Sequence, residues 1–347
     1  IDYGNDTATA SPKGPLAAGL AYGGGVGNNS YGYFASGISS PGYPQNPVTT
    51  IQRIDYSSDT STAVVKGPKS FESMSSQGCG TQSYGYFAGG PSGKSTIDRV
   101  DYSNDTATAA AKGPLDAAKS TFAAASNSSY GWWMGGFPGQ SLVSRLDFSS
   151  DTTTASPRGS MNTGKSLGAG TGNQSYGYAA GGTPGSPKTQ VDRIDYSNDT
   201  GTASLKGPLS VGRYRFSAAS SRADVNPTST PSTVTVDKGA DGYTTSTSGP
   251  AYGYWAGGEP GLTTVTRLDF GNDTATQAPK GNLVEESKSF GGTASISYAY
   301  FYGGSSPGIS TISRIDFAND SANATPKGPL ASVQKYHTAV GNNNYGY

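Results

Sequence analysis

The chain has 347 residues with 24 Lys and Arg against 24 Asp and Glu, so its formal net charge is zero. A neutral chain lacks the long-range field that steers a protein to nucleic acid, and we expect no nucleic-acid partner. The single cysteine, Cys79, excludes an intrachain disulfide. No stretch approaches the about 18 apolar residues of a membrane span, so we expect no membrane insertion. The chain begins at Ile1 rather than Met, which predicts that it is processed or trimmed from something longer.

One motif recurs seven times and sets the expected architecture. A clear copy is RIDYSNDT at residues 193–200. The first aspartate of the motif falls at Asp2, Asp55, Asp101, Asp147, Asp195, Asp269 and Asp316. Five of the six intervals lie between 46 and 53 residues and the other is 74, a spacing typical of propeller and kelch repeats rather than helical solenoids. The 51 Gly and 21 Pro residues recur at fixed places in the repeat, which indicates turns rather than disorder.

The first departure from the repeat is a widened loop near the N-terminus. The chain opens on an expected third strand at residues 1–3, and the loop follows at residues 38–50. It is five to seven residues longer than its counterparts and carries Tyr43, Gln45 and Asn46. Long loops on a rigid scaffold often bind ligands, so these three residues are candidate binding residues.

The third unit shows how one repeat builds a blade. Its four expected strands are residues 120–126, 130–136, 142–148 and 152–156. The hairpin loop between the last two strands is residues 149–152. Four short antiparallel strands in a repeat of about 47 residues are typical of a propeller blade. A glycine inside the second strand indicates close approach of the backbone to a neighbour. These glycines are Gly32, Gly85, Gly131, Gly177 and Gly253.

The third strand of each unit alternates in a way that predicts ion pairs. In residues 191–196, Arg193 and Asp195 lie on the same face of the strand. Blades cover both faces of a middle strand, so we predict a partly buried ion-pair lattice repeated around a ring. The predicted pairs are Arg53/Asp55, Arg99/Asp101, Arg145/Asp147, Arg193/Asp195, Arg267/Asp269 and Arg314/Asp316.

The fifth unit contains an insertion. From Lys206 to Tyr252 there are 46 residues, where the other units have 18. The extra segment, residues 221–248, is rich in Thr, Ser and Pro and predicts a protruding hairpin or an arm that pairs with a neighbour. Its candidate binding residues are Asp237, Lys238, Asp241 and Tyr243. Ligand binding, tolerated decoration and homo-oligomer formation through this segment all remain open.

The chain ends at residues 345–347 on what is expected to be a second strand. The Tyr-led second strand also occurs seven times, so seven blades result if the two ends share one blade. The predicted fold class is therefore all-β: one seven-bladed propeller spanning residues 1–347, with four antiparallel strands per blade and closure by both termini. Residues 221–248 are its one insertion.

Few residues have the pattern of a catalytic or metal site. His337 is the only histidine, and zinc, copper or a catalytic triad needs more imidazole or thiolate than the chain has. We predict that the hairpin aspartates stabilise turns and bind no calcium, because each tip offers one carboxylate. These are Asp6, Asp59, Asp105, Asp151, Asp199, Asp273 and Asp320. Cys79 is predicted to be a small buried filler. We therefore expect no metal, no cofactor and no catalytic residue.

The repeat unit resembles the kelch repeat: an aromatic strand ending in Gly-Gly, a loop, a strand with Asp-Tyr or Asp-Phe, a polar turn and a short outer strand. It departs from that family in having Thr-Ala-Thr where kelch units usually carry a Trp. Residues 84–115 also look similar to propeller proteins of marine bacteriophages. That resemblance implies a structural or tail-associated protein on a virion or other extracellular surface.

The expected function is a non-enzymatic binding or structural module. Its expected partner is a host-surface glycan or another virion protein. The alternative is a polysaccharide lyase or hydrolase on the propeller scaffold, since propellers can host paired carboxylates. Outside the framework aspartates, Glu285 and Glu286 are the only adjacent acids.

Overall fold

The computed structural model describes residues 13–39, 46–90, 94–220, 252–295, 297–304, 308–335, 339 and 345–347. Within them the chain forms 24 strands and one short 3₁₀ helix, η1 (Phe148–Ser150). None of the helical structure in this part of the chain is long and apolar enough to cross a bilayer. The predicted all-β class is confirmed.

The strands form six antiparallel sheets of four strands each, and in each sheet the strands are neighbours in chain order. The first sheet contains β1 (Gly24–Gly27), β2 (Tyr31–Ala35), β3 (Ile51–Asp55) and β4 (Val64–Lys66). The second contains β5 (Gln77–Gly80), β6 (Tyr84–Gly90), β7 (Lys94–Asp101) and β8 (Ala110–Lys112). The third contains β9 (Ala123–Ser126), β10 (Tyr130–Met134), β11 (Val143–Asp147) and β12 (Ser156–Arg158).

The other three sheets repeat this plan. The fourth contains β13 (Ala169–Gly172), β14 (Tyr176–Ala180), β15 (Val191–Asp195) and β16 (Ser204–Lys206). The fifth contains β17 (Ser217–Ser220), β18 (Tyr252–Ala256), β19 (Val265–Asp269) and β20 (Ala278–Lys280). The sixth contains β21 (Gly291–Ala294), β22 (Tyr298–Tyr302), β23 (Ile312–Asp316) and β24 (Thr325–Lys327). The outer strands begin later than expected: β12 starts at Ser156, where the sequence predicted its end.

The number of blades differs from the prediction. The described residues form six four-stranded sheets, so the expectation of seven blades is wrong. The motif count overestimated the number because only six stretches of the chain carry all four strand segments in order. In the sequence, the first aspartate motif, at Asp2, and the last Tyr-led segment, at Tyr345, belong to no complete set of four segments. The expected pairing of residues 1–3 with residues 345–347 falls partly outside the described residues, which begin at residue 13.

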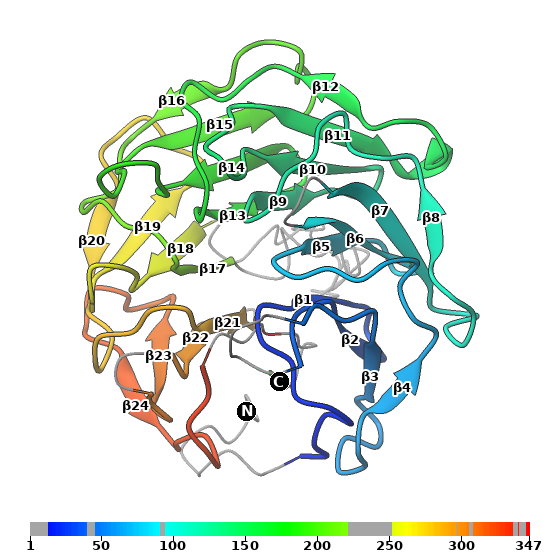
Figure 1. Cartoon of the computed structure of the whole chain (residues 1–347). Helices are drawn as coiled ribbons and strands as arrows, with labels where there is room; N and C mark the ends of the chain where they lie inside the picture. Colours follow the sequence, from blue (N-terminus) through cyan, green and yellow to red (C-terminus); the bar gives the residue numbers. More distant parts are fainter. Residues whose placement is uncertain are drawn as a thin grey trace, which may run out of the picture.

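The sheets are arranged around a central axis as a β-propeller (Figure 1). Their inner strands, β1, β5, β9, β13, β17 and β21, gather at the centre, and each contacts the next from β1 to β21. The C-terminal Tyr347 lies between the first and last sheets. Its carbonyl oxygen accepts a hydrogen bond of 2.9 Å from the Tyr302 hydroxyl, and its ring stacks on Tyr56 at 5.1 Å.

Aromatic pairs join neighbouring sheets. The central aromatic residue of a second strand stacks on the aromatic residue that follows the third strand of the next sheet. The pairs are Tyr33/Tyr102, Tyr86/Phe148, Trp132/Tyr196, Tyr178/Phe270 and Tyr254/Phe317, with ring centroids 3.8–5.3 Å apart. Such a pair contributes about 0.5–1.5 kcal/mol beyond the area it buries. The same interface therefore recurs between five successive pairs of sheets.

Three of the second-strand glycines, Gly85, Gly131 and Gly253, lie against a side chain of the preceding sheet. A Cβ atom at Gly131 would lie 2.6 Å from the Cys79 sulfur and 3.2 Å from the Phe148 ring. Cys79 is buried in the hydrophobic core, so the prediction of a small buried filler is confirmed. Burial raises the pKa of its thiol well above the ordinary value.

Candidate functional site

The framework charges form a lattice between sheets rather than within a strand. Five of the six described framework arginines pair with the hairpin aspartate of the next sheet, not with the aspartate two residues along their own strand as predicted. The pairs are Arg53/Asp105, Arg99/Asp151, Arg145/Asp199, Arg193/Asp273 and Arg267/Asp320, with N···O distances of 2.7–3.1 Å.

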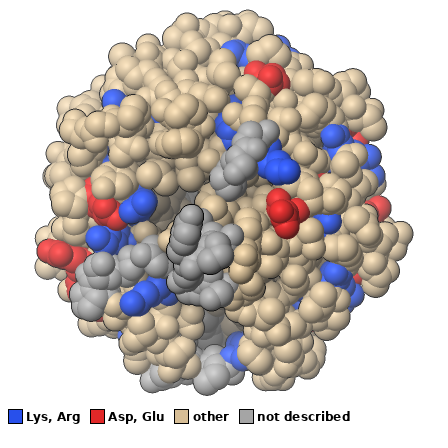
Figure 2. All heavy atoms as spheres, in the orientation of Figure 1, with Lys and Arg blue, Asp and Glu red and all other residues tan. Residues whose placement is uncertain are grey.

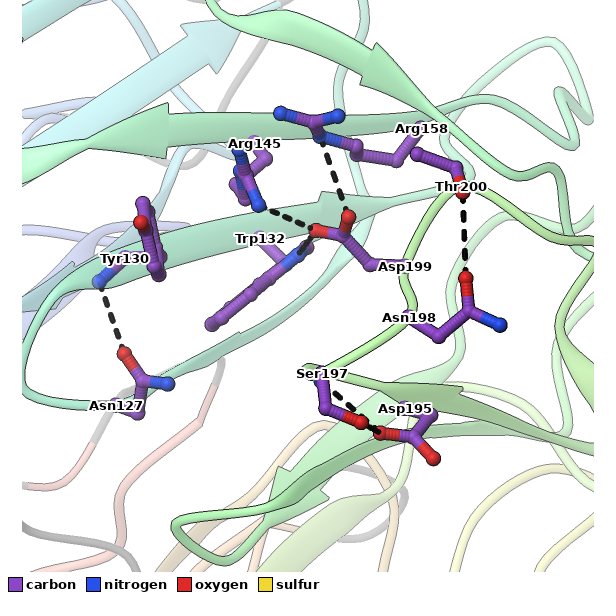
Figure 3. Close-up of polar contacts among 10 residues, drawn as sticks. All are labelled: Asn127, Tyr130, Trp132, Arg145, Arg158, Asp195, Ser197, Asn198, Asp199 and Thr200. Atoms are coloured by element: carbon purple, nitrogen blue, oxygen red, sulfur yellow. Dashed lines mark hydrogen bonds and ion pairs between the residues drawn. The ribbon is translucent and has the colours of Figure 1, made fainter.

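The contacts of Asp199 illustrate how one hairpin aspartate joins two sheets (Figure 3). Its carboxylate accepts a hydrogen bond of 2.8 Å from the Trp132 indole nitrogen and pairs with Arg145 at 3.1 Å. Arg158, at the end of the outer strand, adds a second cation at 3.4 Å. Asp199 itself is 5% exposed. The hairpin aspartates from Asp105 to Asp320 thus hold sheets together, and the prediction that they stabilise their own turns is corrected.

The turn is stabilised by the first aspartate of the motif instead. The Asp195 carboxylate accepts hydrogen bonds from the Ser197 backbone N–H at 3.0 Å and the Ser197 hydroxyl at 2.7 Å (Figure 3). The Ser197 hydroxyl bond is the largest influence that lowers the pKa of Asp195. The predicted partner, Arg193, contributes less to this lowering and pairs with Asp273.

Buried lysines form a second set of charged groups that the sequence did not indicate. Lys165 pairs with Asp192 at 2.6 Å and is 2% exposed. Lys119 is equally buried, and its ammonium donates to the Trp133 carbonyl at 3.1 Å. Burial lowers the pKa of Lys119 to about 8. Because both ammonium groups are buried and bound to protein groups, we assign them to the framework.

Most of the predicted binding residues lie outside the described residues. They are Tyr43, Gln45, Asp237, Lys238, Asp241 and Tyr243, together with His337. Asn46 is described and exposed. The structure therefore brings none of these seven binding candidates together in the part of the chain it describes, and they remain predictions.

The described residues do contain a cavity on the propeller axis, which the sequence did not predict. It has a volume of ≈ 190 Å³, and a second space of ≈ 280 Å³ lies beside it. Both are lined by Gln77, Phe122, Phe216 and Phe290, so they are neighbouring parts of one hollow. We call the first part the axial cavity. It lies where the inner strands begin.

A belt of main-chain hydrogen bonds runs around the axial cavity. It consists of one residue from each of six successive repeats: Tyr22, Ser75, Thr121, Leu167, Arg215 and Ser289. Each of the last five donates its backbone N–H to the carbonyl oxygen of the belt residue before it, at 2.8–3.2 Å. Because the bonds join main-chain atoms, the belt keeps its course while the side chains change from Tyr to Ser, Leu or Arg.

Every belt residue has a left-handed backbone. The φ angles lie between 51° and 58°, and none of the six is glycine. This conformation costs roughly 1–2 kcal/mol for an ordinary L-residue and is rarer still for a β-branched one such as Thr121. Strain of this kind persists where the surrounding structure enforces it, often beside ligand sites. Six equivalent strained residues around one cavity mark it as the candidate site.

A charged cluster borders the axial cavity at the fifth and sixth sheets. The Glu259 carboxylate accepts hydrogen bonds from the Tyr214 hydroxyl at 2.6 Å and from Arg215 at 3.0 Å. The Lys288 ammonium lies 3.7 Å from the same carboxylate. Arg215 also lines the axial cavity, so the charged cluster of Tyr214, Arg215, Glu259 and Lys288 adjoins it.

The charges in the cluster set the protonation of its members. Partial burial acts to raise the pKa of Glu259, but the Tyr214 hydrogen bond and the charges of Arg215 and Lys288 outweigh it, and the pKa is lowered. The hydrogen bond to Glu259 raises the pKa of Tyr214. At neutral pH the cluster thus contains a carboxylate, two cations and a protonated tyrosine that can donate.

Metal donors are not grouped in the described residues. No three His, Cys, Asp or Glu side chains lie close enough there to hold a metal ion. The thiol of Cys79 is buried, and His337 lies outside the described part. Copper in proteins favours imidazole and sulfur ligands. The described side chains therefore do not fit a copper centre.

The fold defines the class of this chain as a β-propeller, and solved structures share it. No family model and no curated protein matches the sequence. A fungal alcohol oxidase of the AA5 family, solved in complex with copper, matches with a TM-score of 0.69 and 12% sequence identity. The match covers 97% of this chain and 70% of that one. At this identity the likeness establishes the fold alone.

That likeness contradicts two expectations from the sequence. We expected a non-enzymatic binding or structural module and classed the chain as not an enzyme. The propeller that matches nearly the whole chain is an enzyme, so the scaffold gives no ground for that expectation. The resemblance to kelch units and to phage proteins is supported only as far as the propeller arrangement of sheets.

Proposed function

We propose that the chain is a polysaccharide lyase that acts on uronate-containing polymers. The observation that carries the proposal is the charged cluster, in which two cations and a tyrosine converge on Glu259 beside the axial cavity. An active site that occurs once in a repeat protein needs residues that differ from those at the equivalent places of other repeats. The charged cluster has such residues. At the places of Tyr214 and Arg215 the third unit has Ser120 and Thr121.

Each member of the cluster has a role in β-elimination. Arg215 and Lys288 bind the carboxylate of the uronate in place of Glu259. Without these two cations the pKa of Glu259 rises, and Glu259 accepts the proton from C5 of the sugar. Tyr214, held protonated, donates to the departing O4. The C5–H electron pair becomes the C4=C5 double bond as the C4–O4 bond breaks, so neither water nor an oxidant is consumed.

The cluster favours elimination over hydrolysis. Glycoside hydrolases use two carboxyl groups on either side of the scissile bond, about 5 to 9.5 Å apart. The charged cluster has one carboxylate, with cations where a second acid would be needed. Elimination needs those cations, because they neutralise the uronate and stabilise the charge that develops when the C5 proton leaves.

The source of the substrate follows from the resemblances in the sequence. The kelch-like repeat and the similarity to marine phage propellers support a place on a virion or other extracellular surface. A host-surface polysaccharide is then the polymer within reach. On the face shown in Figure 2, Lys, Arg, Asp and Glu are scattered among uncharged residues, in keeping with a partner that is not nucleic acid.

Homo-oligomer formation through residues 221–248 stays a separate proposal, tested by deleting residues 223–246 and measuring oligomer mass.

The test is an elimination assay on the purified chain. Uronate polymers and neutral glucans are incubated with it, and the C4=C5 double bond is followed by ultraviolet absorbance. We expect product from uronate polymers only. Glu259→Gln and Tyr214→Phe should each lower kcat by about 10²-fold or more, the range of proton-transfer catalysis. Glu72→Gln is the matched control, because Glu72 is exposed and lies in another repeat.

Two results would overturn the proposal. New reducing ends without a double bond would show hydrolysis. Turnover that survives Glu259→Gln at the rate of Glu72→Gln would show that the charged cluster is not the active site.

A further inference from the structure

Phe137 is an aromatic residue that the propeller leaves in solvent. It is 65% exposed, and among the aromatic residues that the structure describes it is the only exposed one. At the equivalent place in the first repeat Ile38 is 1% exposed, so the framework can bury an apolar residue there. A single apolar side chain on a surface is ordinary, so the place of Phe137 in the fold decides whether it is a binding residue.

Phe137 and Glu259 occupy equivalent places in the third and fifth repeats. Each follows the second strand of its sheet and donates its backbone N–H to the carbonyl oxygen of the residue before the belt residue. Phe137 donates to Ser120 at 2.8 Å, and Glu259 donates to Tyr214 at 2.9 Å. Because the sheets repeat one plan around the axis, these equivalent places lie on the same rim of the propeller (Figure 1). The exposed ring therefore shares a rim with the proposed catalytic carboxylate.

One repeat separates Phe137 from Glu259 along this rim. The third, fourth and fifth sheets follow one another around the axis (Figure 1), and the fourth places the half-buried Thr183 between the two residues. Sheets that pack face to face lie about 10 Å apart, which puts Phe137 and Glu259 roughly 20 Å from each other. One sugar ring is too short to touch both residues, whereas a polysaccharide several sugars long can.

The loop that carries Phe137 is held in place before any ligand binds. Gly139 and Gln140 each donate a backbone N–H to the Gly136 carbonyl, at 2.7 Å and 2.8 Å. A Cβ atom at Gly139 would lie 2.9 Å from the ring of Pro184, so the loop also packs against the loop of the next repeat. A side chain on a fixed loop loses little conformational entropy when a ligand covers it.

We infer that Phe137 is a separate sugar-binding subsite, on which one ring of a polysaccharide stacks while another part of the same polymer lies at the charged cluster. The inference rests on the proposed function. The C–H face of a sugar ring is apolar and can cover the phenyl ring, while the sugar hydroxyls stay in water. Because only a long polymer can reach both places, the subsite should favour long polymers over short oligosaccharides.

Calorimetry on the Glu259→Gln variant, in which the proposed turnover is stopped, tests the subsite by binding alone. We expect the further change Phe137→Ala to raise the Kd of polygalacturonate by about tenfold, through loss of one stacked ring, and to leave the Kd of trigalacturonate unchanged. Phe137→Trp keeps an aromatic face and should retain the affinity for polygalacturonate. Leu205→Ala is the matched control, because Leu205 is 54% exposed on the outer strand β16 and should leave both Kd values unchanged.

Three results would overturn the inference. Equal Kd values of polygalacturonate for Phe137→Ala and Leu205→Ala would show that no sugar stacks on the ring. An equal loss of affinity for trigalacturonate would place the ring within the cleavage site, and no binding of polygalacturonate at all would remove its proposed occupant. The lyase proposal is judged separately, by the unsaturated product. If the unmodified chain forms none while Phe137→Ala still weakens the binding of polygalacturonate, the lyase proposal falls and the sugar-binding subsite stands.

Discussion

Removing the charge of Asp199 tests how far the inter-sheet lattice holds the propeller together. Asp199→Asn keeps the shape of the side chain but leaves Arg145 and Arg158 without their anion. Breaking one partner of a dry buried pair costs about 3–5 kcal/mol. The two guanidinium groups are 20% and 17% exposed, and water compensates them in part. We therefore expect the free energy of unfolding to fall by about 2–4 kcal/mol.

The measurement is urea unfolding followed by far-ultraviolet circular dichroism, with Asp195→Asn as the control. Asp195 belongs to the same hairpin but makes only exposed bonds to Ser197, so its loss should cost about 1 kcal/mol. Asp151→Asn, at the equivalent place in the preceding interface, should match Asp199→Asn. If Asp195→Asn destabilises the chain as much as Asp199→Asn, the hairpin aspartates do not act as inter-sheet ties.

Two further predictions concern buried groups. The pKa of Lys119 is about 8 in the folded chain and near 10.4 in the unfolded chain. Between these two pH values the unfolded state binds more protons than the folded state. The free energy of unfolding should therefore rise with pH from about 8 to 10. Lys119→Met should flatten that rise in denaturation curves at several pH values, and an unchanged slope would contradict the assignment. Gly131→Ala should cost about 1–3 kcal/mol because its Cβ would meet the Cys79 sulfur at 2.6 Å. In a Cys79→Ala background the cost should fall by about half, and equal costs in both backgrounds would refute the contact.

Much of the fold could be predicted from the repeat because strand alternation and turn residues act locally. Tyr130–Met134 and Val143–Asp147 lie where the pattern predicted strands. The number of sheets could not be read from motif counts, since a motif at a chain end marks part of a sheet. The pairing of Arg193 with Asp273 also could not be predicted from the sequence. Alternation shows which face a side chain occupies but not which residue of the next sheet faces it.

The candidate site escaped prediction because its members are far apart along the chain. Glu259 lies 44 residues after Arg215 and 29 before Lys288, and each looks like an isolated surface charge in the sequence. A signal was nevertheless present. Aligning the repeats places Arg215 at the position that Tyr22, Thr121 and Leu167 occupy, a cationic residue where these other units have an uncharged one.

The lattice and the belt hold the sheets together in different ways. The lattice depends on side-chain charge, so its aspartates and arginines have to recur in each repeat to keep the sheets in register. The belt depends on main-chain N–H and C=O groups, so residues as different as Leu167 and Arg215 occupy equivalent places with the same backbone. A substitution in the belt therefore changes the wall of the axial cavity while the hydrogen bonds beneath it persist. The left-handed backbone strains each of these six residues, and most of all a β-branched one such as Thr121.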